Sequence, residues 1–227
     1  MSVTAIMQDY LAEAYRIASY QDDEYVSTSE LADRLHKTAP AVVRMASRLD
    51  NAGLIEHKPY QGIRLTVSGE HEALISIRRH RIVEAFLVNV MGFGWHEVHD
   101  EGEELASAVT QRVLDRMEEM AGMPRRCPHG EPIPTRDGIM PKVDDVALAE
   151  LEPTQQLTVS RVNTHDAEKL IYLHEIRLTP GQDIELISRA PFNGPLRLRI
   201  DRDEQVIGGE LAEAVRACNR GQFELTV

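Results

Sequence analysis

Histidine, cysteine and carboxylate residues recur in the middle of this 227-residue chain at spacings that suit a divalent metal ion. His80 and Glu84 are four residues apart, so they share one face if the segment is helical. Imidazole and carboxylate together suit Mn, Fe, Co or Zn. Cys127 and His129 flank a proline and could chelate one ion. Either pair alone also fits a surface contact or a packed loop, so the metal-site prediction depends on their combination.

Further candidate ligands lie near these two pairs. His99 opens a second, acidic helical segment, and Glu103 lies one turn along on the same face. A carboxylate in that position is also typical of an ordinary helix start. In the last third of the chain, His165, Asp166 and Glu168 could close the site from outside, and the sequence does not choose among them.

Two helices are expected to position these side chains. Apolar spacing predicts one helix over about 68–90, ended by Gly92 and Gly94, and another from His99 to about Ala121. The second helix carries an apolar stripe suited to a dimer interface or a core face. Its members are Leu105, Ala108, Val109, Val113, Met117 and Met120.

The first third of the chain has the pattern of a winged helix-turn-helix, a DNA-binding arrangement. Helices are predicted over 4–20, from Ser27, and from Thr38 to about Asn51, followed by two short strands over 54–58 and 63–67. Ser27 with Glu30 fits a capping box, and Pro40 stands in a first turn, where proline is tolerated.

The third of these helices is the expected recognition helix, whose early residues face base edges in the major groove. Arg44 is the candidate for a bidentate contact with guanine. Although the net charge is −12, residues 34–81 carry nine basic against four acidic residues, and residues 97–119 carry eight acidic against two basic. The predicted DNA-binding residues are Ser27, Lys37, Thr38, Pro40, Ala41, Val43, Arg44, Arg48, Lys58, Tyr60 and Arg64.

The remainder of the chain is expected to be mostly β-structure. Prolines between 124 and 141 mark an irregular connection, and strand-like patterns begin at Leu157, with one short helix near 167–173. Five strands in a small barrel are predicted. The expected fold is therefore mainly α with β, in three domains: 1–72 for DNA binding, 73–141 for metal binding and dimerisation, and 142–227 as a small β-barrel.

Other classes of protein are disfavoured. No apolar run approaches the ~18 residues of a membrane span, and the first ten residues lack a basic signal region, so a cytoplasmic protein is expected. Two cysteines are too few for a disulfide framework. The chain has no nucleophile elbow, phosphate loop or His-Glu-x-x-His motif, so an enzyme is not expected.

Four segments together resemble the DtxR/MntR family of metal-dependent transcriptional regulators in its long, manganese-sensing form. Residues 79–84 read RHRIVE, residues 98–101 read VHDE and residues 127–134 read CPHGEPIP. Residues 178–181 (LTPG) with 208–212 (GGELA) are similar to the family's SH3-like, FeoA-type domain. The resemblance implies a homodimer that binds double-stranded, palindromic operator DNA once divalent metal is bound.

The resemblance also implies a set of metal ligands. His80, Glu84 and His99 match one family site, to which Cys127, His129 and Asp166 contribute in manganese-sensing members. Asp9 and Glu103 match ligands of a second site. Ala12, Ala106 and Ser107 stand where that second site has further ligands, so it is depleted. The region of His80, Glu84, Cys127 and His129 is therefore expected to dominate sensing.

Manganese is the favoured metal, and iron is the alternative. A carboxylate-rich site suits Mn(II), whereas the single thiolate raises affinity for softer ions, so Zn, Co or Cd could bind in vitro. Three other interpretations stay open: a winged-helix regulator that answers a non-metal ligand, a metalloenzyme, and a C-terminal domain that tunes the dimer without touching metal.

Overall fold

A computed structural model describes residues 3–21, 23–153, 155–223 and 225. The chain divides into two compact units, Met1–Arg79 with Pro134–Met140, and His80–Ile133 with Pro141–Val227. Each unit is described by itself. Among the described helices, none combines the length and the apolar character that a membrane span requires.

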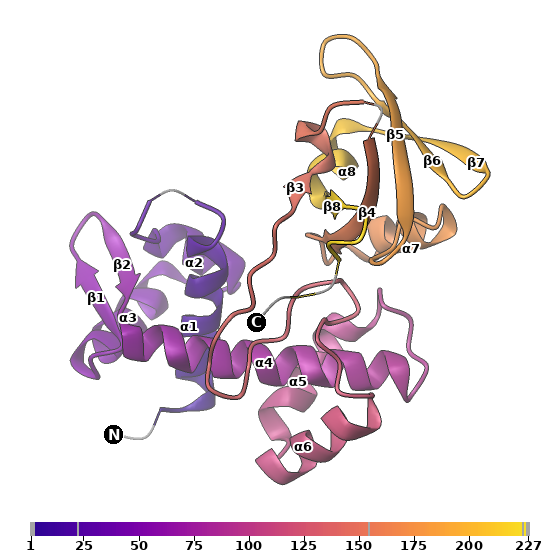
Figure 1. The fold of residues 1–227 in the computed structure, drawn as a ribbon. Helices are drawn as coiled ribbons and strands as arrows, with labels where there is room; N and C mark the ends of the chain where they lie inside the picture. The colour runs from indigo at the N-terminus through magenta and orange to yellow at the C-terminus, as the bar shows by residue number, and fades with distance from the viewer. Residues whose placement is uncertain (1–2, 22, 154, 224, 226–227) are drawn as a thin grey trace. The chain divides into compact units, whose positions relative to one another are not determined.

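The first unit begins as a winged helix-turn-helix. Its elements are α1 (Ala5–Ala18), α2 (Thr28–Arg34), α3 (Ala39–Asn51), β1 (Ile55–Lys58), β2 (Gly62–Leu65) and the start of α4 (Val67–Asn89) (Figure 1). Ser27 is the N-cap of α2, and its hydroxyl accepts a hydrogen bond from the Ser29 amide at 3.3 Å. Thr38 occupies the N-cap position of α3, but its side chain makes no capping hydrogen bond.

A single apolar core holds these elements together. Leu11, Leu31, Leu49 and Ile63 are almost fully buried in it, so each of α1, α2, α3 and β2 contributes a side chain. The β1–β2 hairpin is antiparallel, and Ile63 of β2 also pairs with Val26 ahead of α2. The hairpin, or wing, is thereby fixed to the helices rather than projecting freely.

The helical part of the second unit contains the last turns of α4, then α5 (Val98–Ala108) and α6 (Gln111–Met120). The sequence predicted one helix from His99 to about Ala121, which was wrong. Val109 is extended and ends α5, and the equally extended Thr110 begins α6. Two successive β-branched residues lose side-chain freedom in a helix, which favours a break there.

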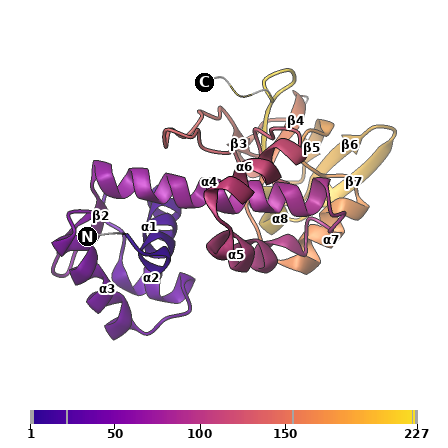
Figure 2. The same cartoon turned by 90° about the horizontal axis from the view of Figure 1, so that it is seen from below.

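α5 and α6 lie beside the second half of α4 and share a core with it (Figure 2). Of the predicted apolar stripe, Met117 is buried, Leu105 and Val109 are partly buried, and Ala108, Val113 and Met120 are exposed. The stripe therefore supplies both a core face and an exposed apolar face.

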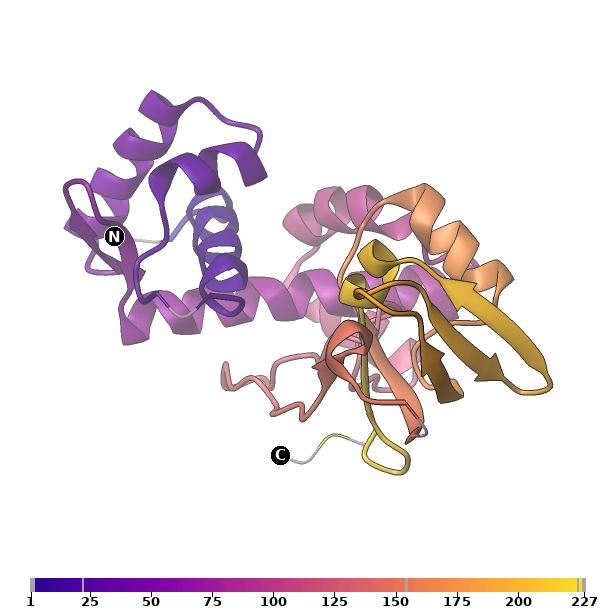
Figure 3. The same cartoon turned by 90° about the horizontal axis from the view of Figure 1, so that it is seen from above.

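The rest of the second unit is one antiparallel sheet of order β3-β8-β4-β5-β6-β7. Within the residues that the structure describes, this sheet has six strands, where the sequence predicted five. Their bounds are β3 (Val146–Ala147), β4 (Gln155–Val162), β5 (Asp183–Arg189), β6 (Leu196–Ile200), β7 (Asp203–Ile207) and β8 (Val215–Asn219), with η1 (Leu148–Glu150), α7 (Ala167–Glu175) and α8 (Gly209–Ala214) between them. Strands β5, β6 and β7 run side by side (Figures 1 and 3).

Candidate metal centre and nucleic-acid interface

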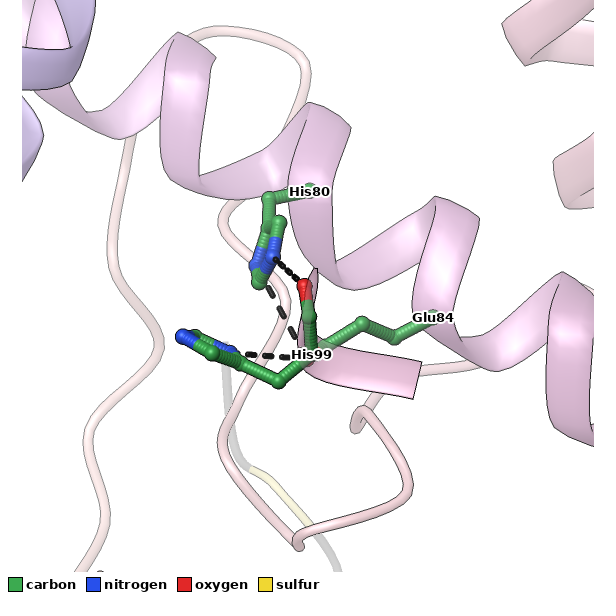
Figure 4. A group of neighbouring side chains, drawn as sticks. All are labelled: His80, Glu84 and His99. Carbon is green, nitrogen blue, oxygen red and sulfur yellow. Dashed lines mark hydrogen bonds and ion pairs between the residues drawn. The ribbon is translucent and has the colours of Figure 1, made fainter. Parts of the chain in front are cut away.

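The second unit brings two groups of ligand-type side chains onto one carboxylate. His80 and Glu84 lie one turn apart on α4, and His99 at the start of α5 points toward them (Figure 4). Glu84 also belongs to a second group with Cys127 and His129, and within each group the ligand atoms lie within 4.8 Å of one another. The sequence predictions for these five residues therefore converge in space, and we call them the candidate metal centre.

Glu84 Oε1 is the common point of the centre. It lies 3.9 Å from His80 Nδ1, 3.7 Å from His99 Nδ1 and 3.8 Å from His129 Nδ1. Two atoms bound to one ion at about 2.0–2.3 Å are at most about 4.6 Å apart. The three distances thus fit donors that share an ion, and they exceed an ordinary hydrogen bond.

Backbone carbonyls set the tautomers of two histidines. His129 Nε2 donates to the Trp95 carbonyl at 2.8 Å, and His80 Nε2 donates to the His99 carbonyl at 3.3 Å. Because a carbonyl only accepts, each Nε2 must carry the proton. Each Nδ1 then faces Glu84, and a hydrogen bond from the other ring nitrogen is how proteins commonly orient a metal-binding imidazole.

The residues present fit a divalent cation. Among the described side chains, Glu84 Oε1, His99 Nδ1 and His129 Nδ1 are buried atoms with no hydrogen-bond partner. Polar atoms left unpaired in the interior cost free energy, and most are satisfied in native proteins. Three such atoms facing one another are explained by an ion that all three would bind.

The electrostatics of the centre favour the same explanation. Burial alone would raise the pKa of Glu84, but the neighbouring histidines, His80 first, hold it well below its usual range. Burial lowers the pKa of His129 by disfavouring its protonated form, and burial raises the pKa of the Cys127 thiol. A bound cation would favour the thiolate, and the thiolate with the Glu84 carboxylate would balance a 2+ charge.

The loop that carries Cys127 and His129 is fixed by close contact with β4. The Cys127 amide donates to the Glu131 carbonyl, and the Val162 amide of β4 donates to the His129 carbonyl, both at 2.9 Å. Gly130 has φ 86°, and a Cβ there would clash with the Ser160 carbonyl. Glycine at this position therefore allows the loop to lie directly against the strand.

Among the third-segment candidates, His165 contacts two histidines of the centre. Its ring stacks on His99 with 3.8 Å between centroids and meets His129 edge-on at 5.5 Å. Asp166 instead caps α7, where its Oδ1 accepts from the Lys169 amide at 3.1 Å, and Glu168 is exposed in the first turn of α7. The Asp166 carboxylate, which was predicted as a ligand, is thus engaged with its own helix.

The two predicted ligands of the second metal site, Asp9 and Glu103, belong to different units of the chain. Asp9 is half-buried on α1 of the first unit, and Glu103 is exposed on α5 of the second unit. Their role as ligands stays a prediction. Ala12 and Ala106 each belong to an apolar cluster of their own unit, and the Ser107 hydroxyl donates to the Glu104 carbonyl. The positions without ligands therefore serve packing and local hydrogen bonding.

Sequence reasoning missed the residues that support the ligands. Glu131 receives hydrogen bonds from Arg81 of α4 at 3.1 Å and from Arg161 of β4 at 3.2 Å. Arg161 also binds the buried Asp145. Trp95 supplies the carbonyl that orients His129. Glu131 and Arg81 lie within the CPHGEPIP and RHRIVE motifs, but no local spacing marks Arg161, Asp145 or Trp95.

Most of the predicted DNA-binding residues lie on α3, directly before it, or in the wing of the first unit, and Ser27 is the N-cap of α2. α3 buries Val42, Met45, Ala46 and Leu49 and exposes its other face. Basic side chains with an adjacent apolar residue on an exposed helix face suit the major groove. Lys37, Thr38, Pro40, Val43, Arg44, Arg48, Lys58 and Tyr60 are exposed, and Ser27, Ala41 and Arg64 are half-buried.

Arg64 differs from the other basic residues of this surface. Its guanidinium is paired with Glu24 at 2.6 Å and with Glu56 at 2.8 Å. Arg64 and Lys58 both lie over the Tyr25 ring, at 5.4 and 4.7 Å from its centroid. Arg64 therefore joins the wing to the segment before α2, and its charge is already compensated.

Family models match three successive segments of the chain. The iron dependent repressor N-terminal DNA binding domain matches residues 2–63, and the iron dependent repressor metal binding and dimerisation domain matches residues 66–135. The FeoA domain matches residues 146–217. The candidate metal centre lies within the second segment, and β4 and His165 lie within the third.

Individual relatives are similar to this chain in sequence or structure over most of its length. A diphtheria toxin repressor of Corynebacterium jeikeium is 25% identical over 211 residues, 83% of this chain and 87% of the relative. A manganese-dependent transcriptional repressor solved in complex with manganese is 33% identical with a TM-score of 0.86, covering 94% of this chain and 99% of that one. The crystal structure of T. acidophilum IdeR is 28% identical with a TM-score of 0.76, covering 96% and 98%.

Both the diphtheria toxin repressor and the manganese-dependent repressor are named as repressors, not enzymes. The chain belongs to the iron dependent repressor family, the DtxR/MntR family of divalent-metal-dependent transcriptional repressors that bind operator DNA.

Proposed function

We propose that this chain is a Mn(II)-responsive repressor that binds operator DNA as a homodimer when the ion occupies the candidate metal centre. The observation that carries the proposal is the convergence of Glu84 Oε1, His99 Nδ1 and His129 Nδ1, three buried atoms without a hydrogen-bond partner among the described residues. Membership of the family indicates that metal binding leads to operator binding, and the candidate metal centre is the proposed position of the ion.

A divalent ion at the centre would tie α4, the start of α5 and the 126–131 loop together. His80 and Glu84 are presented by α4, His99 by α5, and Cys127 with His129 by the loop. We propose that the β-domain contributes His165 to the metal centre, in preference to Asp166, because the His165 ring contacts the rings of His99 and His129. A ligand shifts a conformational equilibrium only by binding one state better, and the state with these segments together is the one that it would stabilise.

We propose manganese because of the supply of the ion in the cell and the metal of a similar repressor, not because the ligands bind Mn(II) most tightly. Imidazole, carboxylate and thiolate ligands bind Zn(II) and Co(II) more tightly than Mn(II), so selectivity must come from geometry and supply. The structurally similar repressor solved with manganese supports Mn(II). Iron is the second candidate, because a relative named as an iron-dependent repressor is 32% identical over 127 residues, 54% of this chain and 55% of the relative.

The DNA contacts are assigned to the exposed face of α3 and to the wing. Arg44 is the proposed base-reading residue, and Arg48 and Lys58 are proposed phosphate contacts, because all three are exposed. The proposed dimer contact uses exposed apolar residues of the α6 region, namely Val113, Met120 and Met123. Residues 1–72, 73–141 and 142–227 remain the proposed domain bounds.

The direct test is retention of genomic DNA fragments by metal-free protein during titration with Mn(II). We expect retention of a small set of fragments that share a sequence and require metal. Arg44→Ala should relax the sequence preference of the retained fragments. His80→Ala should bind Mn(II) more weakly, so it should retain less DNA than wild type at every Mn(II) concentration. Selective retention that ignores added metal and chelator would refute metal control and point to a regulator with another ligand.

A further inference from the structure

Arg126 precedes the ligand Cys127 and joins three separate parts of the second unit. Its Nη1 donates to the Gly130 carbonyl at 2.6 Å within the metal-binding loop and approaches the Ser160 carbonyl of β4 at 3.4 Å. Its Nη2 donates to the Phe223 carbonyl at 2.8 Å. The side chain thus spans the loop, the sheet and the C-terminal tail.

Phe223 makes a second contact with the same guanidinium. The Arg126 Cζ lies 4.5 Å above the centroid of the Phe223 ring, a cation–π distance. The edge of the same ring lies near Gly181, where an added Cβ would be 3.6 Å from the Phe223 Cε1 atom. Leu225, two residues further on, is also buried. Phe223 and Leu225, which we call the C-terminal tail, therefore pack onto the unit at this point, although they lie beyond the residues 146–217 that match the FeoA domain.

These contacts matter because the loop has little regular structure of its own. Cys127 and His129 stand on a turn whose Gly130 has φ 86°, and Arg126 donates a hydrogen bond to the Gly130 carbonyl of that turn. A ligand on an irregular loop reaches its binding position only as well as its neighbours hold it.

We propose that Phe223 and Arg126 form a latch through which the C-terminal tail holds the metal-binding loop in the geometry that lets Cys127 and His129 reach the ion. Both are positioning residues and neither is a ligand. This inference rests on the proposed metal centre. Removal of the ring leaves the Arg126 guanidinium without its stacking partner and leaves the tail without its anchor at Gly181, so the loop gains alternative positions in which the thiol is withdrawn.

The test uses Co(II) as a probe, because thiolate ligation gives a charge-transfer band in the near ultraviolet that reports Cys127 directly. Full-length Phe223→Ala is titrated with Co(II) beside wild type, Cys127→Ser and a matched control, Phe192→Ala, which removes an equally large but fully exposed ring between β5 and β6. Phe223→Tyr serves as the rescue variant, since it keeps the aromatic face. Phe223→Leu keeps apolar bulk at Gly181 and is used if the alanine variant does not fold.

We expect Phe223→Ala to weaken Co(II) binding about tenfold or more, the usual effect of losing support for a metal ligand, and to shift or weaken the thiolate band. Phe223→Tyr and Phe192→Ala should match wild type. A Phe223→Ala, or Phe223→Leu, whose band and affinity equal those of wild type would overturn the latch while leaving the metal centre intact. A wild-type spectrum identical to that of Cys127→Ser would overturn the proposed centre and the latch with it.

Discussion

Replacement of Glu84 by glutamine is the most direct probe of the candidate metal centre. Glu84 is 2% exposed, and both groups of ligand-type residues include it. Glutamine keeps the size of the side chain, so packing against α5 is retained. The substitution removes the negative charge that balances the ion and leaves a weakly binding amide oxygen. One change therefore takes a ligand away from every possible arrangement of the centre.

The expected effect can be expressed as metal-induced stabilisation. At a free Mn(II) concentration of 100 times the dissociation constant, binding stabilises the folded wild type by about 2.7 kcal/mol. For a chain of this size, this raises the melting temperature by about 5–11 °C. If the variant binds at least 100-fold more weakly, stabilisation at the same concentration falls to about 0.4 kcal/mol, a rise below about 2 °C.

The assay is thermal unfolding followed by circular dichroism, with and without Mn(II), for wild type, Glu84→Gln and Glu70→Gln. Glu70 is an exposed glutamate near the start of the same helix, so it controls for the loss of charge from α4. The difference between metal-bound and metal-free melting temperatures cancels any effect on the metal-free fold. A Glu84→Gln protein that gains as many degrees from Mn(II) as wild type would refute the assignment of the centre.

Three further predictions concern other residues. His165→Ala should weaken metal binding about tenfold, measured by isothermal titration calorimetry, because the His165 ring supports His99. Asp166→Ala should leave the metal affinity unchanged and lower the free energy of unfolding by about 1 kcal/mol, because the N-cap of α7 is lost. Burial alone would raise the pKa of Asp145, but two arginines hold that pKa below its usual range. The stabilising contribution of Asp145 is therefore present above about pH 4 and is lost as the pH falls further. Asp145→Asn should flatten the acid side of a curve of unfolding free energy against pH, and an unchanged acid side would contradict this prediction. Arg64→Ala should leave the salt dependence of DNA binding unchanged because its charge is paired, whereas Arg48→Ala should lower the slope by about one, and equal slopes for the two variants would contradict the distinction.

The sequence by itself determined the local elements and the types of ligand. Apolar periodicity and capping residues predicted α1 to α4 within a few residues, because helix formation depends on neighbours along the chain. The i,i+4 spacing placed His80 and Glu84 on one face for the same reason. The break at Val109 was missed, since propensity differences at a single point are small beside tertiary packing.

Only the tertiary structure decided how those residues become a centre. His129 takes its tautomer from the carbonyl of Trp95, 34 residues away, and Arg126 meets Phe223 at a separation of 97 residues. Stacking of His165 on His99 likewise joins the β-domain to α5. Such contacts follow from the packing of β4 and the tail against the 126–131 loop, and no periodicity along the chain encodes which distant atoms that packing brings together.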